Sequence, residues 1–306
     1  MTIRMSYLKI MLGCALGLIA QSTMAAKYPA MADILASSKN ADWRALDPET
    51  TLYVELPGGR VIIDMAARFA PLHIAKIKAL ARKRYFNDLP INRVQDNYVV
   101  QWSDPHASSD AAASTTVAPE FDVPLTRDMP FARLPDGDVY APEVGFSEGF
   151  PVARDGKLQR AWLAHCYAMV GVGRDNDPAS GTGQELYVVI GHAPRHLDRN
   201  VALVGRVVQG MELLTSLPRG TDAMGAYAGN QKPLIIKSVM VEADVLAAKR
   251  TNLEVIRTDT PTFMALVESR RNRHEEWFFT PAGHIDLCNV PIVVRPKVCS
   301  GAKCRG

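Results

Sequence analysis

The sequence predicts a mainly β protein whose core is an antiparallel barrel or sandwich. Short strand-like apolar segments recur between Thr51 and Ala243, and only two segments there have a clear helical pattern. Strands and helices do not alternate as they do in a doubly wound parallel sheet. With 306 residues, 47% of them hydrophobic and 22% charged, the chain can form one sizeable core and an appendage, which excludes a disordered chain.

The first elements are a β-hairpin and a helix. Apolar and polar residues alternate on both sides of Pro57–Gly59, which predicts a hairpin over Thr51–Met65. Pro71 suits the first turn of the following helix, because a proline there loses no needed hydrogen-bond donor. The apolar stripe of that helix consists of Ile74, Ile77, Leu80 and Ala81.

The segment Ile91–Asp104, "INRVQDNYVVQWSD", carries two long polar side chains among strand-forming residues. Arg93 and Gln101 interrupt what otherwise resembles a buried strand. Either they face solvent at the edge of a sheet, or they form hydrogen bonds in a place with little water. A solvent-facing arginine is the usual case, so the segment alone favours the first interpretation.

The later elements are mostly strands. Glu185–Gly191 and Val201–Val208 are strand-like on either side of the loop His192–Asn200. Gln209–Leu217 predicts a turn into a short helix, and Pro233–Ala243 predicts a closing strand. The glycines of "GVGRDND" and "GTGQE" lack the context of a phosphate-binding loop, so they predict turns.

The composition of the chain changes at two places. The small, polar segment Pro105–Thr116 predicts a flexible surface loop. After Val245, Thr260 and Pro261 predict the start of a helix that continues to about Trp277, and an extended segment follows. We therefore divide the chain into a leader (26–50), a main domain (51–244) and a C-terminal extension (245–306) packed on the core.

The N-terminus has the layout of a secretory signal peptide, residues 1–25. Arg4 and Lys9 lie before or at the start of an apolar run, Leu8–Ala20, which is followed by polar and small residues. The run is shorter than the roughly 18 to 20 residues that span a bilayer, so we expect cleavage after Ala25 or Ala26 and no membrane anchor afterwards. The rival interpretation, a lipoprotein site at Cys14, is disfavoured because the apolar run continues past it. We expect a periplasmic protein in an oxidising compartment.

Four cysteines remain after cleavage: Cys166, Cys288, Cys299 and Cys304. They allow three sets of pairings among which the sequence cannot choose; a bond across the short loop of "CSGAKC" is the favourite. A zinc site is the rival, but no CxxC spacing supports it. His192 and His196 have a helical spacing with a proline between them in a loop, so no metal site is predicted there.

The charge of the chain does not indicate a nucleic-acid partner. A net charge of +3 is small for 306 residues. One helix carries a basic group that we interpret as a solvated face: Lys76, Lys78, Arg82, Lys83 and Arg84.

The order of the motifs resembles the cyclophilin family of peptidyl-prolyl isomerases. The hairpin and helix are followed by "INRVQDNYVVQWSD", "AMVGVG", "ELYVVIGHAPRHLD" and "VGRVVQGMELL". The resemblance covers roughly Leu52–Ala243 and is interrupted by a longer, altered segment, Asp104–Leu163. It implies a closed antiparallel β-barrel with two capping helices, to which the C-terminal extension adds a helix and an extended appendage.

The resemblance also assigns site residues. In the family, a Phe-His-Arg-Val segment is followed by an aromatic residue, an aliphatic residue or Met, and Gln; here Arg93, Tyr98, Val99 and Gln101 take these places. The later family motifs are similar to Ala168-Met169-Val170, Glu185-Leu186-Tyr187, His196-Leu197-Asp198 and Val204-Gly205-Arg206-Val207. The chain departs from the family at Asn92 (usually His), Glu185 (Gln), His196 (often Trp) and Val201 (near a pocket His). These departures concern substrate preference and rate more than fold.

The resemblance implies isomerisation of X-Pro bonds in exported polypeptides, with no metal or organic cofactor. Arg93 is the expected hydrogen-bond donor to the prolyl nitrogen, and Gln101 is expected to hold it or the substrate in register. The substrate-binding residues are expected to be Tyr98, Val99, Met169, Val170, Tyr187, His196 and Leu197.

Two other functions remain open alongside the isomerase, for which we expect a monomer. One is a cyclophilin-like module that binds proline-containing segments without turnover. The other is a secreted hydrolase, although no Ser, His and Asp spacing supports it.

Overall fold

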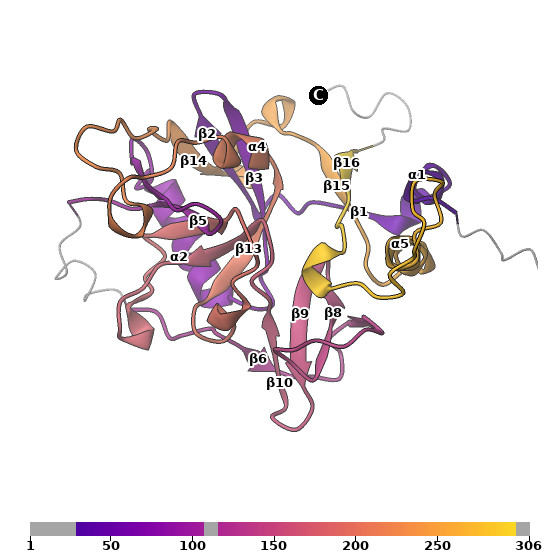
Figure 1. The fold of residues 1–306 in the computed structure, drawn as a ribbon. Helices are drawn as coiled ribbons and strands as arrows, with labels where there is room; N and C mark the ends of the chain where they lie inside the picture. Colours follow the sequence, from indigo (N-terminus) through magenta and orange to yellow (C-terminus); the bar gives the residue numbers. More distant parts are fainter. Residues whose placement is uncertain (1–28, 107–115, 298–306) are drawn as a thin grey trace, which may run out of the picture.

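The computed structural model describes residues 29–106 and 116–297, which form three antiparallel sheets (Figure 1). The largest has eight strands in the order β14-β2-β3-β13-β11-β12-β5-β4. Its strands are β2 (Thr51–Leu56), β3 (Gly59–Met65), β4 (Ile91–Val94), β5 (Val99–Trp102), β11 (Met169–Val172), β12 (Leu186–Val189), β13 (Leu203–Gln209) and β14 (Ser238–Val241). The predicted mainly β fold is confirmed.

The eight-stranded sheet is curled, and its two edges meet at a short bridge. The edge strands β4 and β14 do not form a ladder with each other. Instead, Pro90 and Ile235 form an isolated antiparallel bridge just outside them. The Ile91 N–H donates to the Leu234 carbonyl at 2.8 Å, next to this bridge. The closure that we expected of the barrel is therefore not confirmed: no ladder joins the edge strands, and among the described residues only this bridge and a few backbone hydrogen bonds beside it connect the two edges.

Side chains along the hairpin strands β2 and β3 alternate between the two faces of the sheet. One set of side chains from β2 and β3 points into an apolar core that also contains the buried side of helix α2 (Pro71–Arg82). Pro71 occupies the first turn of α2, as predicted, and Glu120 caps that turn by accepting the N–H groups of Leu72 and His73 at 2.9 Å. At the other end, the short helix α4 (Met211–Thr215) follows Gly210, whose φ of +90° favours glycine.

The remaining two sheets form what we call the outer lobe, which comprises residues 31–45, 123–163 and 253–296. Its five-stranded sheet, in the order β6-β10-β9-β8-β7, consists of the segment that interrupts the family resemblance. Its three-stranded sheet, β1-β15-β16, joins one strand from the leader to two from the C-terminal extension. The strands are β6 (Val123–Pro124), β7 (Ala132–Arg133), β8 (Glu143–Ser147), β9 (Phe150–Asp155), β10 (Arg160–Leu163), β1 (Trp43–Ala45), β15 (Leu253–Ile256) and β16 (Val294–Pro296).

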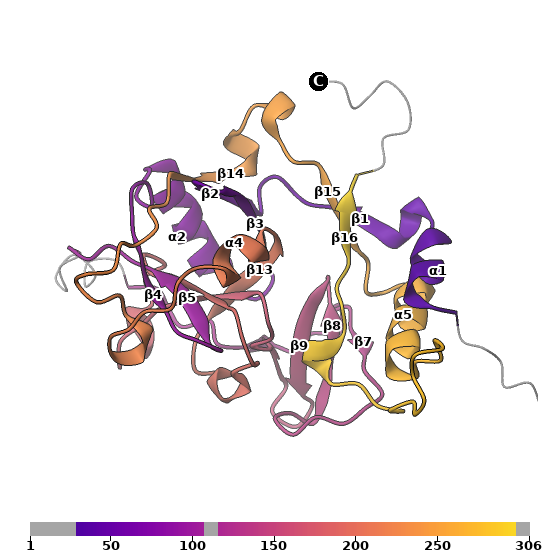
Figure 2. The same ribbon diagram turned by 45° about the horizontal axis from the view of Figure 1, so that its top comes forward.

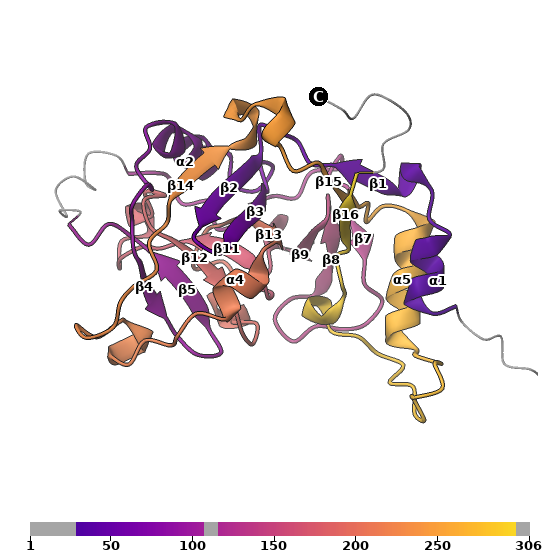
Figure 3. The same ribbon diagram turned by 90° about the horizontal axis from the view of Figure 1, so that it is seen from above.

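Helices α1 (Met31–Ala36) and α5 (Pro261–Arg271) lie side by side at the far end of the outer lobe (Figures 2 and 3). Phe263 of α5 packs edge-on against Phe146 of β8, with ring centroids 5.1 Å apart. A second apolar core runs from this contact to the outer face of the eight-stranded sheet, where it includes Tyr53 and Ile62. The leader and the extension therefore fold together, although they are more than 200 residues apart.

Helix α5 is shorter than the sequence suggested. Thr260 caps it and Pro261 begins it, as predicted, but it ends at Arg271 instead of about Trp277. After Val267 no apolar residue follows before Trp277, so a longer helix would have nothing to bury. Trp277 is 79% exposed.

A disulfide joins Cys166 to Cys288, 122 residues later in the sequence. The favoured pairing, Cys299 with Cys304, lies outside the described residues, as do the predicted signal peptide and most of the predicted loop Pro105–Thr116. In the described parts of the chain, no helix combines the length and apolar character needed to cross a membrane.

Candidate active site

A cleft of about 710 Å³ lies on the outer face of strands β4, β5 and β12. Because side chains alternate along a strand, Val99 and Gln101 of β5 face the cleft while Val100 and Trp102 enter the barrel core. The lining residues are Arg93, Tyr98, Val99, Gln101, Gly173, Arg174, Asp175, Asn176, Asp177, Glu185, Tyr187, Leu197 and Val201.

Arg93 is the cation at the centre of the polar wall. The strand register places it opposite Gln101, and Gln101 opposite Tyr187 on the next strand. Its Nη1 donates to Gln101 Oε1 at 2.8 Å, its Nη2 to Gln95 Oε1 at 2.5 Å, and its Nε to the Met224 carbonyl at 2.7 Å. These bonds fix the guanidinium plane and use three of its five N–H groups, so each Nη keeps one further hydrogen.

Gln101 is itself oriented by Glu185. Its Nε2 donates to Glu185 Oε1, which directs its Oε1 toward Arg93. Burial, reinforced by the charge of Asp175, raises the pKa of the Glu185 carboxyl above its ordinary value, and the bond from Gln101 and the charge of Arg93 only partly oppose this. The wall is thus a row of carboxylate, amide and guanidinium groups.

The raised pKa of Glu185 predicts a pH-dependent effect on stability. Folding penalises the charged carboxylate, so this penalty is absent below the unfolded pKa near 4.5 and complete above the raised folded pKa. Glu185→Gln keeps an oxygen for Gln101 and removes the charge. We expect this variant to be more stable than the wild type at pH 7, with the difference vanishing as the pH falls below about 4.5. Urea unfolding of both proteins from pH 4 to 8 measures this, and a difference that does not change with pH would contradict it.

The opposite side of the cleft is apolar and aromatic. Tyr98, Val99, Tyr187, Leu197 and Val201 line it. The Tyr187 ring lies directly over Gly171 of β11, where an added Cβ would come within 2.2 Å of the ring. Gly171 is therefore required for the ring to reach its place. In this arrangement the apolar slot can bind a small apolar ring, and the guanidinium beside it can donate a hydrogen bond to one polar atom of that ring.

Three of the expected substrate-binding residues do not line the cleft. Met169 and Val170 are fully buried core residues of β11: Met169 packs in the outer apolar core with Tyr187, and Val170 points to the other face, into the barrel core. His196 is exposed in the turn η3 (Arg195–Leu197), outside the lining set. The other expected residues, Arg93, Gln101, Tyr98, Val99, Tyr187 and Leu197, come together in the cleft.

The sequence did not indicate the loop Gly173–Asp177 as part of the site. Its glycines suggested only a turn, and the structure has irregular backbone with a bend there. The position of the loop beside the cleft depends on the pairing of β11 with β12, which no local pattern encodes.

The comparisons with known proteins agree with this arrangement. The family model for "Cyclophilin type peptidyl-prolyl cis-trans isomerase/CLD" matches residues 51–241. Proteins from Brucella suis and Brucella abortus, each described as a "Probable peptidyl-prolyl cis-trans isomerase", are 25% identical over 202 residues, which is 65% of this chain and 86% of theirs.

Among solved structures, the chain is similar to cyclophilin AquaCyp293 from Hirschia baltica, with a TM-score of 0.67 and 24% identity. That similarity covers 83% of this chain and 92% of the other. It extends beyond residues 51–241, so part of the outer-lobe fold is shared as well.

Proposed function

This chain belongs to the cyclophilin family of peptidyl-prolyl cis-trans isomerases, and from this premise we propose that its cleft isomerises X-Pro bonds in exported proteins, with Arg93 as the catalytic residue. The single observation that carries the proposal is the guanidinium of Arg93, held by three hydrogen bonds beside an apolar slot.

The chemistry requires only that the twisted amide be stabilised. Amide resonance sets a barrier of about 18 to 20 kcal/mol, so an X-Pro bond isomerises in roughly 10 to 100 s without a catalyst. As the bond twists, the prolyl nitrogen becomes pyramidal and regains a lone pair. An unused N–H of Arg93 can donate to that lone pair in the transition state, but not to the planar ground-state nitrogen.

Arg93 does not account for the whole acceleration. A charge-assisted hydrogen bond contributes about 1.5 to 3 kcal/mol, and each ~1.4 kcal/mol is tenfold in rate, so it supplies about ten- to a few-hundred-fold. The slot formed by Tyr98, Val99, Tyr187 and Leu197 would bind the proline ring and exclude water, which strengthens the same bond. Gln101, oriented by Glu185, would keep the guanidinium aimed at the slot.

Two observations support exported proteins as the substrates. The N-terminal residues have the pattern of a secretory signal peptide. The Cys166–Cys288 disulfide is typical of proteins in oxidising compartments such as the periplasm. All residues of the proposed site come from one chain, so we propose that a monomer in the periplasm suffices for activity.

Exchange NMR on a short Ala-Pro peptide tests the proposal. We expect the wild-type protein to accelerate cis–trans interconversion. We expect Gln101→Leu to lower kcat/KM about three- to tenfold, because Arg93 loses one of its three anchors. Absence of acceleration by the wild type would reject the isomerase on this substrate.

A binding module without turnover is the alternative, and Glu185 is the observation that favours it. Its carboxylate accepts a hydrogen bond from Gln101, which in turn accepts one from Arg93. The negative charge of Glu185 therefore weakens the positive potential at the slot. Peptide binding without acceleration by the wild type would identify this module. Acceleration restored by Glu185→Gln would then assign the loss to the carboxylate.

A further inference from the structure

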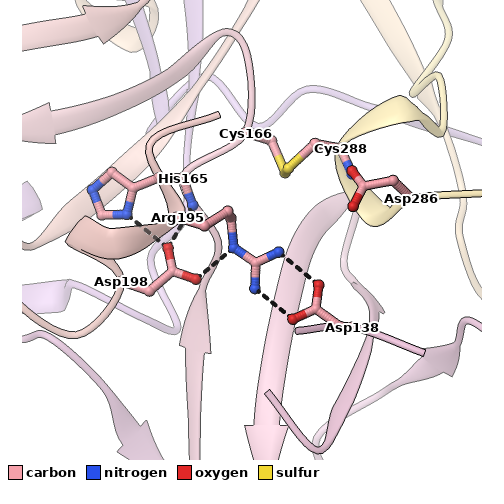
Figure 4. The surroundings of a disulfide bond; sticks show 7 residues. All are labelled: Asp138, His165, Cys166, Arg195, Asp198, Asp286 and Cys288. Carbon is pink, nitrogen blue, oxygen red and sulfur yellow. Dashed lines mark hydrogen bonds and ion pairs between the residues drawn. A yellow bond between two sulfur atoms is a disulfide. The ribbon is translucent and has the colours of Figure 1, made fainter. Parts of the chain in front are cut away.

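A buried chain of polar side chains runs from the floor of the cleft into the outer lobe. The Tyr187 hydroxyl lies 2.9 Å from His165 Nε2, and His165 Nδ1 lies 2.9 Å from Asp198 Oδ1. Arg195 Nε donates to Asp198 Oδ2 at 2.6 Å, and its Nη1 and Nη2 bind Asp138 at 2.8 and 3.2 Å. Figure 4 shows the row from His165 to Asp138 beside the Cys166–Cys288 disulfide.

We propose that His165 is a positioning residue of the isomerase: it holds the Tyr187 ring in the orientation that forms the floor of the proline slot. The inference rests on the proposed function and deepens it. Tyr187 lies in the cleft, whereas His165 is completely buried behind it and reaches the substrate only through Tyr187.

The hydrogen-bond pattern fixes the direction of each bond. Asp198 Oδ1 also accepts the His165 backbone N–H at 2.9 Å, so the carboxylate is anchored on the side of Nδ1. Burial lowers the pKa of the His165 imidazole, so the neutral ring carries its hydrogen on Nδ1, toward Asp198. Nε2 is then an acceptor. Burial also raises the pKa of the Tyr187 hydroxyl, which stays protonated and donates to Nε2.

The slot depends on this bond because the hydroxyl is the polar end of the Tyr187 ring, and His165 Nε2 is its partner. The ring is 6% exposed: it rests on Gly171, which has no side chain, and packs in the outer apolar core while still lining the cleft. A ring that swung off Gly171 would occupy the volume meant for proline. The hydroxyl bond to a histidine that cannot move prevents this.

The outer lobe is what makes His165 immobile. Asp138 belongs to the lobe, and its ion pair with Arg195 leaves both side chains no more than 4% exposed. Cys166, the residue after His165, is covalently bonded to Cys288 of the extension. The lobe is thereby connected to Tyr187 through the row of Asp138, Arg195, Asp198 and His165.

A double-mutant cycle tests the inference. His165→Asn keeps an amide donor for Asp198 but has nothing at the position of Nε2, and Tyr187→Phe keeps the ring but removes the hydroxyl. We expect each single variant to bind the Ala-Pro peptide about five- to tenfold more weakly by NMR titration, with kcat changed less than about twofold. We expect the double variant to match the single variants, because both changes break the same bond.

Two further variants complete the design. His165→Gln places an amide oxygen near the position of Nε2, and we expect it to restore affinity to within about twofold of the wild type. The exposed His192→Asn is the matched control and should bind like the wild type. If His165→Asn is too unstable to assay, the Tyr187→Phe and His165→Gln arms still decide the question: unchanged affinity in Tyr187→Phe, or a tenfold loss in His165→Gln, rejects the inference.

Other outcomes distinguish a positioning role of His165 from a purely structural role. Full additivity in the double variant, or a loss of stability with unchanged peptide affinity in His165→Asn, would show that His165 serves the fold only. Because affinity is measured without turnover, coupled affinities in a protein that does not accelerate isomerisation would uphold the role of His165 while rejecting the isomerase.

Discussion

Arg93→Ala is expected to lower kcat/KM for an Ala-Pro peptide by about ten- to a few-hundred-fold. The variant removes the donor proposed for the prolyl lone pair, a bond that forms only as the amide twists. The loss should therefore appear in kcat more than in peptide affinity, because the apolar slot remains. Exchange NMR at several peptide concentrations separates the two effects.

Two further variants help to interpret this result: Arg93→Lys tests the charge alone, and Arg257→Ala is a control remote from the cleft. A lysine keeps the charge but has no planar fork to bond Gln101, Gln95 and the Met224 carbonyl together, so we expect it to recover only a small part of the rate. Arg257 pairs with Asp259 in the outer lobe, and its removal should leave kcat/KM unchanged. Equal rates for wild type and Arg93→Ala, both folded by circular dichroism, would mean that another group acts on the prolyl nitrogen.

The two residues of the polar wall could be singled out from a local signal, although their role in a site followed only from the family resemblance. Arg93 and Gln101 stand out as long polar residues in a strand pattern, and the two-residue period of a strand then places Gln101 on the face opposite Trp102. The same period implies that the adjacent residues Met169 and Val170 cannot both face the cleft, and in the structure Val170 enters the barrel core while Met169 packs in the outer core. Whether a strand residue lines a cleft depends on what covers it, and here Tyr187 of the neighbouring strand reaches over Gly171.

The residues that depart from the family pattern lie at different distances from the cleft, so their expected effects on activity differ. Asn92 is not in the cleft lining; its amide donates to Ser103 Oγ at 2.8 Å across the strand pair. Glu185 and Val201 do line the cleft. Differences in rate or preference between this chain and its relatives should therefore be sought at these two positions.

The outer lobe lay beyond sequence reasoning because its three segments meet only through long-range pairing. Each has short strands of two to six residues, which carry little signal by themselves. The leader strand β1 pairs with β15, which lies more than 200 residues later in the sequence. The cysteine pairing depends on the same assembly, and spacing alone could not reveal it.

Removing the Cys166–Cys288 bond is expected to lower the free energy of unfolding by about 2 to 5 kcal/mol. The bond spans 122 residues and ties the β10–β11 connection to the C-terminal extension, so it restricts a large part of the unfolded chain. Changing both residues, Cys166→Ala and Cys288→Ala, avoids leaving an unpaired thiol at either position. Denaturant unfolding of this double variant and the wild type, both oxidised, measures the difference.

The same variant separates this bond from the other cysteines, since it retains Cys299 and Cys304. A reductant should destabilise the wild type much more than the variant, and similar losses in both would place the stabilisation elsewhere. Cys166 adjoins His165, so loosening the extension should also free the network that holds Tyr187. We therefore expect weaker peptide binding in the double variant, even under conditions in which it is fully folded. Unchanged affinity there would mean that the ion pairs of Arg195 with Asp138 and Asp198 suffice to fix His165 without the covalent bond.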